Sequence, residues 1–123
     1  MIREIKFYKN YFIEFYLALN IKDQEKIDYV FNMVSTLHQV PEKFLKHIQD
    51  SDGLYEIRIS YGSKAFRIFC CFDKGNIIIL LNGFIKKKSK TPKSELNLAI
   101  KLMNQYFNEK GWSHEKDKRS KNI

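Results

Sequence analysis

Three consecutive strand-like runs in the middle of the sequence constrain the fold of this chain more than any other feature. The runs cover 54–60, 65–72 and 76–84, with polar turns at 61–64 and 73–76. Arg58 and Arg67 lie inside the first two runs, on an apolar, β-branched and aromatic background in which an arginine has no packing role. The sequence therefore predicts a sheet on which both arginines face an anionic group.

The first turn sets the register of the two arginine-bearing runs. An even-residue loop pairs Ser60 with Ala65, and antiparallel alternation then places Arg58 opposite Arg67. The same register forms a continuous apolar face from the pairs Ile57–Ile68, Ile59–Phe66 and Tyr55–Cys70. Because two like charges directly opposite each other are destabilising, we expect an anion or a carboxylate between them, and Glu56 can supply that carboxylate in the free protein.

The second turn extends this row of side chains. If Lys74-Gly75 is a two-residue turn, Asp73 pairs with Asn76 and Arg67 faces Asn82. A bulged turn at Gly75 would reverse this parity. In the two-residue register, one patch collects Glu56, Arg58, Arg67, Asn82, Phe84 and Lys86, with Lys87, Lys88 and Lys90 at its rim.

The chemistry of this patch suits a phosphodiester. Arginine forks bind phosphate oxygens in bidentate fashion, and a lysine among other cations can take part in proton transfer. Phe84 or Tyr61 can offer a stacking surface for an unpaired base. The alternatives are a solvated lysine loop and a surface salt bridge between Glu56 and either arginine.

Composition and charge agree with an anionic partner. The chain has 123 residues, enough for one small domain, and carries a net charge of +8 with a pI near 9.5. This charge favours nucleic acid, an anionic membrane surface or an acidic protein as partner, unless a lysine-rich genome alone explains it. We expect the domain to cover 1–112 and the charged tail 113–123 to be mobile.

Several classes of protein are not indicated. The first ten residues lack the apolar core of a signal peptide, and no apolar run is long enough to span a bilayer, so we expect a cytoplasmic protein with no membrane partner. Cys70 and Cys71 are adjacent, which places them on opposite faces of a strand and prevents a mutual disulfide. No zinc-type spacing of Cys and His occurs, so we expect no metal and no cofactor.

The remaining segments predict an α+β domain. The expected elements are a strand at 3–8, a helix at 11–20, a helix capped by Asp23 and ended by Pro41, a helical turn at 42–49, and a last helix with Thr91 as N-cap, Pro92 as first residue and Gly111 as stop. The expected apolar stripes are Ile27, Val30, Phe31, Val34 and Leu37, then Leu96, Ala99, Ile100, Met103 and Phe107. The order β-α-α-β-β-β-α predicts an antiparallel-dominated, twisted sheet with helices packed mainly on one face.

Three motifs resemble those of a known family. They are Gly53-Leu54-Tyr55-Glu56-Ile57-Arg58, then Phe66-Arg67-Ile68-Phe69, and Leu80 to Pro92, read LLNGFIKKKSKTP. Together they resemble the HigB-type, phage Gp49-like branch of the RelE/ParE toxin superfamily. The resemblance is close over residues 53–109 and only general before residue 50.

The resemblance implies a RelE-like sheet-and-helix toxin of a type II toxin–antitoxin pair. Such toxins are metal-independent, ribosome-dependent endoribonucleases that cut translated mRNA by attack of the 2′-hydroxyl, and a helix-turn-helix antitoxin neutralises them. Carried over by position, the candidate catalytic residues are Arg58, Arg67, Lys86, Lys87 and Glu56. The candidate RNA-binding residues are Lys64, Asn82, Phe84, Lys88 and Lys90.

One departure from the family pattern affects the proton-transfer assignment. Asn82 stands where the family frequently has a histidine before Gly-Phe, so a lysine or Glu56 would have to move the proton. The alternatives are that the activity is weakened or that this position is structural. Two other functions stay open on the same fold: a ParE-like gyrase inhibitor, and a noncatalytic RNA-binding or antitoxin-binding module.

Overall fold

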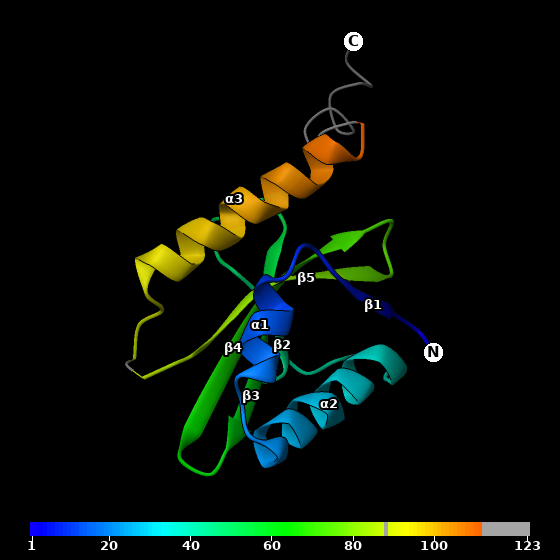
Figure 1. The fold of residues 1–123 in the computed structure, drawn as a ribbon. Helices are drawn as coiled ribbons and strands as arrows, with labels where there is room; N and C mark the ends of the chain where they lie inside the picture. The colour runs from blue at the N-terminus through cyan, green and yellow to red at the C-terminus, as the bar shows by residue number, and fades with distance from the viewer. Residues whose placement is uncertain (88, 112–123) are drawn as a thin grey trace.

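The fold is a five-stranded sheet with helices on both of its faces (Figure 1). The computed structural model describes residues 1–87 and 89–111. Its elements are β1 (Glu4–Phe7), α1 (Tyr11–Leu17), α2 (Ile21–Thr36), β2 (Leu45–His47), β3 (Leu54–Tyr61), β4 (Lys64–Asp73), β5 (Ile77–Ile85) and α3 (Lys93–Glu109). The predicted charged tail 113–123 and Lys88 lie outside the described residues.

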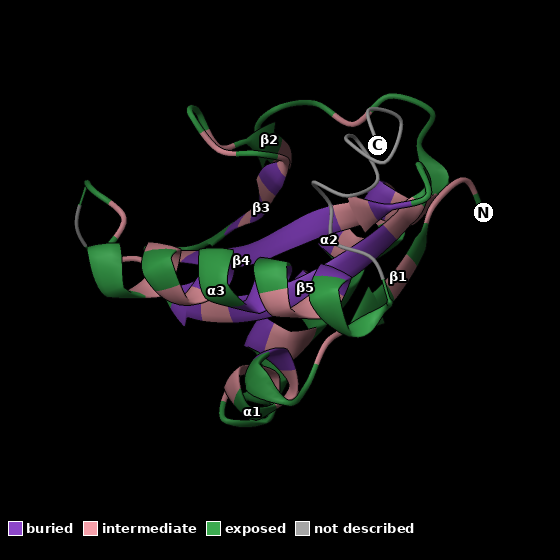
Figure 2. Ribbon diagram, turned by 90° about the horizontal axis from the view of Figure 1, so that it is seen from above, coloured by how far each residue is buried: buried purple, intermediate pink, exposed green. Residues whose placement is uncertain are grey.

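The sheet is antiparallel except at one edge. Its strand order is β1-β5-β4-β3-β2, and β1 alone runs parallel to its neighbour, β5. This topology confirms the predicted α+β class and antiparallel-dominated sheet. Figure 2 shows buried residues concentrated on β4 and β5, with exposed residues on the outer sides of α1 and α3.

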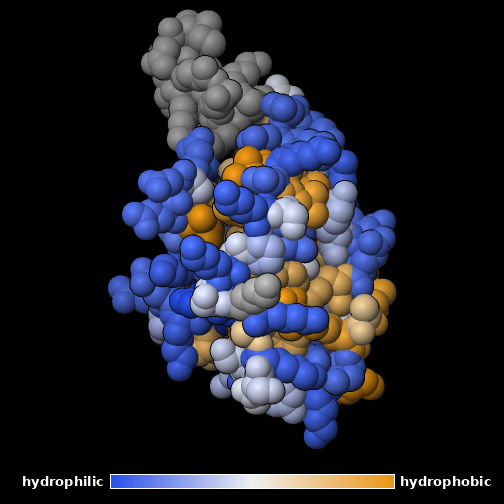
Figure 3. All heavy atoms as spheres, turned by 90° about the vertical axis from the view of Figure 1, so that its left-hand side faces the viewer, coloured by the Kyte–Doolittle hydropathy of each residue, from blue (hydrophilic) through white to orange (hydrophobic). Residues whose placement is uncertain are grey.

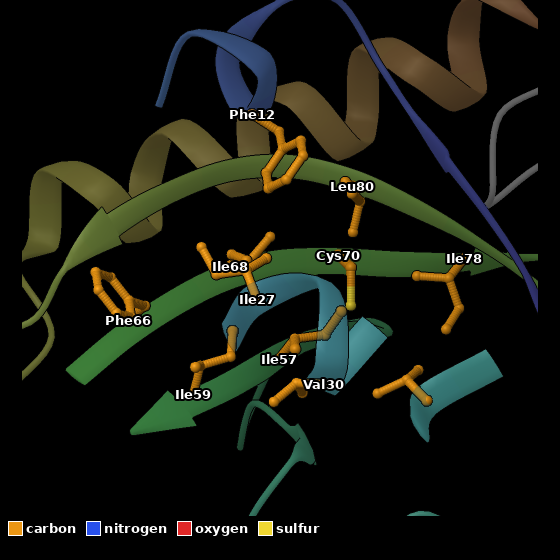
Figure 4. Packing of buried hydrophobic residues seen from close by; sticks show 11 residues of the cluster. Phe12, Ile27, Val30, Ile57, Ile59, Phe66, Ile68, Cys70, Ile78 and Leu80 are labelled. Carbon is orange, nitrogen blue, oxygen red and sulfur yellow. The ribbon is translucent and has the colours of Figure 1, made fainter. Parts of the chain in front are cut away.

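Two apolar cores lie on opposite faces of the sheet. The first packs α1 and α2 on residues that include Ile57, Ile68 and Cys70 (Figure 4). The second packs α3 on residues that include Phe69 and Cys71. The expectation of helices on one face therefore describes α1 and α2, while α3 covers the other face.

The β3–β4 hairpin has the predicted register. Arg58 is the cross-strand partner of Arg67, and Ser60 is the partner of Ala65. The predicted pairs of the apolar face, Tyr55–Cys70, Ile57–Ile68 and Ile59–Phe66, are also present. Gly62 in the turn has φ +61, the left-handed conformation that glycine adopts without strain.

The β4–β5 hairpin differs from the predicted register in two places. Asp73 pairs with Ile77 instead of Asn76, because the connection contains three residues, with φ 54 at Lys74 and 82 at Gly75. A bulge between Ile68 and Cys70 then adds one more residue to β5. The two shifts together place Phe84, not Asn82, opposite Arg67.

The predicted helical turn at 42–49 is wrong for most of its length. Residues 42–44 form a turn in which the Phe44 and Leu45 amides donate to the Pro41 carbonyl, at 2.9 and 3.1 Å. Leu45–His47 then forms β2, which pairs with β3. Pairing with the edge of β3 satisfies the backbone groups of this segment and overrides its weak helical pattern.

Two predicted helix caps are also corrected. The Asn20 side chain, not Asp23, caps α2 by accepting a 2.8 Å hydrogen bond from the Asp23 amide. At α3 the N-cap position belongs to Pro92, without a side-chain cap, and the helix begins at Lys93 instead of Pro92. Thr91 therefore lies before the cap.

The predicted helix stripes are mostly right. Ile27, Val30 and Val34 are buried in α2, and Leu37 is 40% exposed at its end. In α3 the buried residues are Ala99, Leu102, Met103 and Phe107, and Ile100 is 38% exposed, so the stripe lies closer to Leu102 than predicted.

Both cysteines are free and buried. Cys70 belongs to the core under α1 and α2, and Cys71 belongs to the core under α3, as the strand alternation predicts. Within residues 1–87 and 89–111, none of the helices has the length and apolar character needed to cross a bilayer.

Candidate functional site

The two paired arginines share one buried carboxylate. Arg58 on β3 and Arg67 on β4 lie on the α3 side of the sheet, with Glu56 two residues before Arg58 on the same face. Glu56 Oε2 lies 3.5 Å from Arg58 Nε, and Glu56 Oε1 lies 4.0 Å from Arg67 Nε. The predicted carboxylate between two like charges is therefore present in the free protein.

Burial differs between the two arginines. The Arg58 side chain is 30% exposed, whereas that of Arg67 is 9% exposed and donates from Nη1 to its neighbour Phe66 O at 3.0 Å. Burial lowers the pKa of the Arg67 guanidinium; the Glu56 carboxylate opposes this shift and the charge of Arg58 adds to it. The site thus combines one buried cation with one that reaches solvent.

The lysine segment lies at the end of β5. The Lys86 amide donates to the Ala65 carbonyl at 2.7 Å, which extends the β4–β5 pairing and places Lys86 on the face of the arginines by alternation. Lys87 and Lys90 are exposed and line a hollow of about 540 Å³ beside the β5–α3 connection. Figure 3 faces this side of the molecule, where hydrophilic side chains gather next to a smaller hydrophobic area.

Asn82 and Phe84 lie against α3 instead of in an open patch. The Asn82 amide, 2% exposed, donates to Glu95 O at 3.0 Å and to Glu95 Oε1 at 3.1 Å. Phe84 is 7% exposed and packs on Phe69 with ring centroids 5.7 Å apart. Asn82 therefore joins β5 to the first turn of α3, and Phe84 belongs to the core.

Lys64 lies apart from the arginines. It pairs with Tyr61 at the tip of the β3–β4 hairpin, on the face that carries α2. Its Nζ lies 2.9 Å from Oδ2 of Asp23, which is buried in the first turn of α2. This contact joins the hairpin to α2 and leaves Lys64 outside the site.

The structure adds one cation that the sequence reasoning missed. Lys46 on β2 is the cross-strand partner of Glu56, and its neighbour Leu45 packs in the opposite core, so Lys46 lies on the site face. Lys46 is exposed. The sequence Phe-Leu-Lys-His at 44–47 lacks the apolar–polar alternation that indicates a strand, and a helical turn is predicted at 42–49 instead.

Together, four adjacent strands each place one cation on the same face. These are Lys46 on β2, Arg58 on β3, Arg67 on β4 and Lys86 at the end of β5. Neighbouring strands are about 4.8 Å apart, so the row has the dimensions of a few consecutive phosphate groups. No group of three or more His, Cys, Asp or Glu in the described part of the chain could hold a metal ion.

Comparison with known protein families identifies the family of this chain. A model of the phage-derived Gp49-like protein family matches residues 14–104. The chain belongs to this family. Gp49-like proteins are RelE/HigB-type toxins, and the resemblance found in the sequence is thereby confirmed.

A solved structure supports the same fold for this Gp49-like chain. The crystal structure of an archaeal RelE–RelB complex from Pyrococcus horikoshii OT3 aligns with a TM-score of 0.51 and 18% identity, over 74% of this chain and 100% of that chain. At this identity the likeness establishes the fold alone. A comparison with curated proteins found no match.

Proposed function

We propose that this Gp49-like protein is a ribosome-dependent endoribonuclease that cleaves translated mRNA and so inhibits translation. The observation that carries the proposal is the pairing of Arg58 with Arg67 around the Glu56 carboxylate, at the centre of a row of cations. Like-charged partners in a sheet are destabilising, and a phosphate group is the ligand that would offset this cost.

The proposed reaction uses a nucleophile that RNA itself carries. The 2′-oxygen attacks the adjacent phosphorus, the bond from phosphorus to the 5′-oxygen breaks, and a 2′,3′-cyclic phosphate and a free 5′-hydroxyl result. The proton of the 2′-hydroxyl leaves and the 5′-oxygen gains one, with Lys86 and Lys87 as the candidates for these transfers. The two arginines stabilise the negative charge that develops on the phosphate oxygens.

The other cations are assigned to the RNA backbone. Lys46 extends the row beyond Arg58, and Lys90 lies on the far side near the start of α3. The net charge of +8 supports binding to a polyanion such as the ribosome with its bound message. The proposal leaves out Lys64, Asn82 and Phe84 as RNA contacts, because each is engaged elsewhere in the fold.

We also propose an antitoxin partner with a helix-turn-helix fold. Support comes from the family and from the archaeal relative, whose RelE chain is in complex with RelB. An open reading frame next to the gene for this chain should then encode that small protein.

The deciding experiment is induced expression followed by mapping of mRNA 5′ ends across the transcriptome. We expect growth arrest and cuts inside translated codons, and we expect the cuts to disappear when translation is blocked beforehand. DNA-damage signalling with intact messages would reject the nuclease and favour gyrase inhibition. Binding to RNA without either cuts or growth arrest would favour the noncatalytic module.

A further inference from the structure

The Glu56 carboxylate divides its oxygens between two arginines. Oε2 faces Arg58 at 3.5 Å and Oε1 faces Arg67 at 4.0 Å. Both ion pairs are formed with the inner Nε atom of the guanidinium. The carboxylate therefore lies beside the Nε atoms of both planar groups.

The inner nitrogens are closed to solvent. Arg58 Nε and Arg67 Nε are both buried, and neither has a hydrogen-bond partner in the described part of the chain. A buried donor of a charged group is costly unless an acceptor is near. An anion that arrives from solvent cannot reach these atoms, whereas Glu56 already lies beside both of them.

The terminal nitrogens of the two arginines differ from Nε in their surroundings. The Arg58 side chain is 30% exposed, and Arg67 Nη1 donates to the Phe66 carbonyl at 3.0 Å. Because both Nε atoms are buried, a phosphate group can contact the two arginines only through their terminal nitrogens. A guanidinium that is fixed at Nε presents its terminal N–H groups in a fixed plane. Resting on the phosphate site proposed above, we propose that Glu56 is a positioning residue that holds Arg58 and Arg67 by Nε, so that their terminal nitrogens act as one fork for a single phosphate group.

The effect of removing the Glu56 charge on phosphate binding distinguishes a positioning role from the alternative, in which Glu56 merely occupies the anion site. If Glu56 merely occupies the anion site, its removal should strengthen phosphate binding, because a negative charge leaves the site. If Glu56 positions the arginines, its removal should weaken binding although the site becomes more positive. The two roles thus predict opposite results for Glu56→Gln.

The test titrates inorganic phosphate and follows the arginine Nε–Hε signals by NMR. The proteins are the full chain, Glu56→Gln and the control Glu4→Gln, which removes an exposed carboxylate from β1 that pairs with Lys6 at 3.8 Å. We expect equal binding by wild type and Glu4→Gln, and about tenfold weaker binding by Glu56→Gln. Tenfold corresponds to the loss of roughly one charge-assisted hydrogen bond between the arginine fork and the phosphate. Equal or tighter binding by Glu56→Gln would overturn the positioning role.

A second variant shows whether Glu56 acts through the arginine. In an Arg58→Ala background, Glu56→Gln should weaken phosphate binding by clearly less than tenfold, because one of the two groups that it positions is gone. A full, additive loss would contradict the proposal, since a general loss of structure would act in both backgrounds.

A measurement on the wild type keeps the test independent of the variant's folding. At saturating phosphate, the carboxyl ¹³C signal of Glu56 should stay close to its ligand-free position. Movement of that signal to the position of a solvent-exposed glutamate would show that phosphate displaces Glu56, and would overturn its role. If phosphate perturbs neither Arg58 nor Arg67, the proposed site itself fails.

Discussion

Asp73 and Glu56 are two buried carboxylates on the same face of the sheet, and their surroundings differ. Asp73 Oδ2 accepts hydrogen bonds from Tyr106, at 2.6 Å, and from Lys110, both at the C-terminal end of α3. Among the described residues, Glu56 makes two longer ion pairs, one with Arg58 and one with Arg67. One carboxylate therefore holds a helix in place, and the other lies between two arginine side chains of the sheet.

The different contacts of Asp73 and Glu56 indicate different roles on one face of the sheet, stability for Asp73 and binding for Glu56. Burial alone would raise the pKa of the Asp73 carboxyl, but the hydrogen bonds from Lys110 and Tyr106 outweigh it and keep that pKa below its ordinary value. The arginine pair keeps a like-charge contact that these two strands would be more stable without. Changes near Asp73 should lower stability, whereas changes near Glu56 should mainly lower activity.

Loss of the buried arginine should have the largest effect. Arg67→Ala should reduce mRNA cleavage by about 10²–10³-fold, the range for loss of one donor to a developing oxyanion, with the fold retained. The measurement is the frequency of new mRNA 5′ ends after induction. The control is Arg3→Ala, which loses bonds to the Val34, Leu37 and His38 carbonyls and should keep cleavage activity. Full toxicity of Arg67→Ala would remove the proposed site.

Loss of the Asp73 carboxylate should lower stability most. Asp73→Ala should reduce the free energy of unfolding by about 2 kcal/mol, below the value for a fully buried pair because Lys110 is 29% exposed. Denaturant titration measures this change. The arginine Nε–Hε signals should stay in place, and a change in them comparable to that of Glu56→Gln would show that the two carboxylates are coupled.

The same carboxylate should shape the pH dependence of stability. Because the pKa of Asp73 is lower in the folded state, its contribution is full above the pKa of the unfolded chain, about 3.9, and is lost as pH falls through the folded value. Burial and the Asp73 hydrogen bond raise the pKa of Tyr106, so its contribution is full below about pH 10 and is lost as pH rises further. Unfolding curves from pH 2 to 11 should show both losses, and Asp73→Asn should flatten them. Identical curves for the two proteins would contradict this account.

Asn82→Ala tests whether Asn82, which stands where the family frequently has a histidine, joins β5 to α3 instead of contacting the ligand. Loss of two hydrogen bonds from a buried amide should cost about 1–2 kcal/mol of stability, with phosphate binding at the arginines unchanged. Asn76→Ala is the matched control, since its amide makes one 3.5 Å contact with Ile2 O. A selective loss of phosphate binding in Asn82→Ala would return Asn82 to the binding site.

The smallest effect is expected at Lys46. Lys46→Ala should weaken binding of a single-stranded RNA by about two- to threefold and reduce its salt dependence by about one phosphate contact. The matched control is Lys26→Ala on α2, whose ammonium lies over the Tyr29 ring at 5.1 Å. RNA binding is measured by fluorescence anisotropy at several salt concentrations. Equal losses of RNA affinity in both variants would show that Lys46 acts only through the net charge of the protein and not as part of a binding row.

The pairing of Arg58 with Arg67 could be predicted from the sequence because its register is local. A tight turn and strict alternation fix which residues of β3 and β4 face each other, and they also place Glu56 beside Arg58. The family motifs lie in this same region. The local spacing of turn and strand is thus enough to predict which residues lie beside Arg58 and Arg67.

The rest of the site depends on contacts that single-sequence patterns do not contain. The segment at Leu45–His47 becomes a strand only because the edge of β3 is available, and this hid Lys46. The bulge in β5 turns Asn82 toward Glu95 of α3, a partner thirteen residues later in the chain. Tertiary pairing decides both outcomes.

The adjacent cysteines give this molecule two built-in reporters. Cys70 lies beneath α1 and α2, Cys71 lies beneath α3, and burial raises the pKa of both thiols, that of Cys71 to about 12. Thiol reagents therefore react with each one only when the layer above it opens. The relative rate of alkylation at Cys70 and Cys71 therefore distinguishes opening of the α3 layer from opening of the α1 and α2 layer. The measurement needs no engineered cysteine, because both reporters belong to the natural sequence.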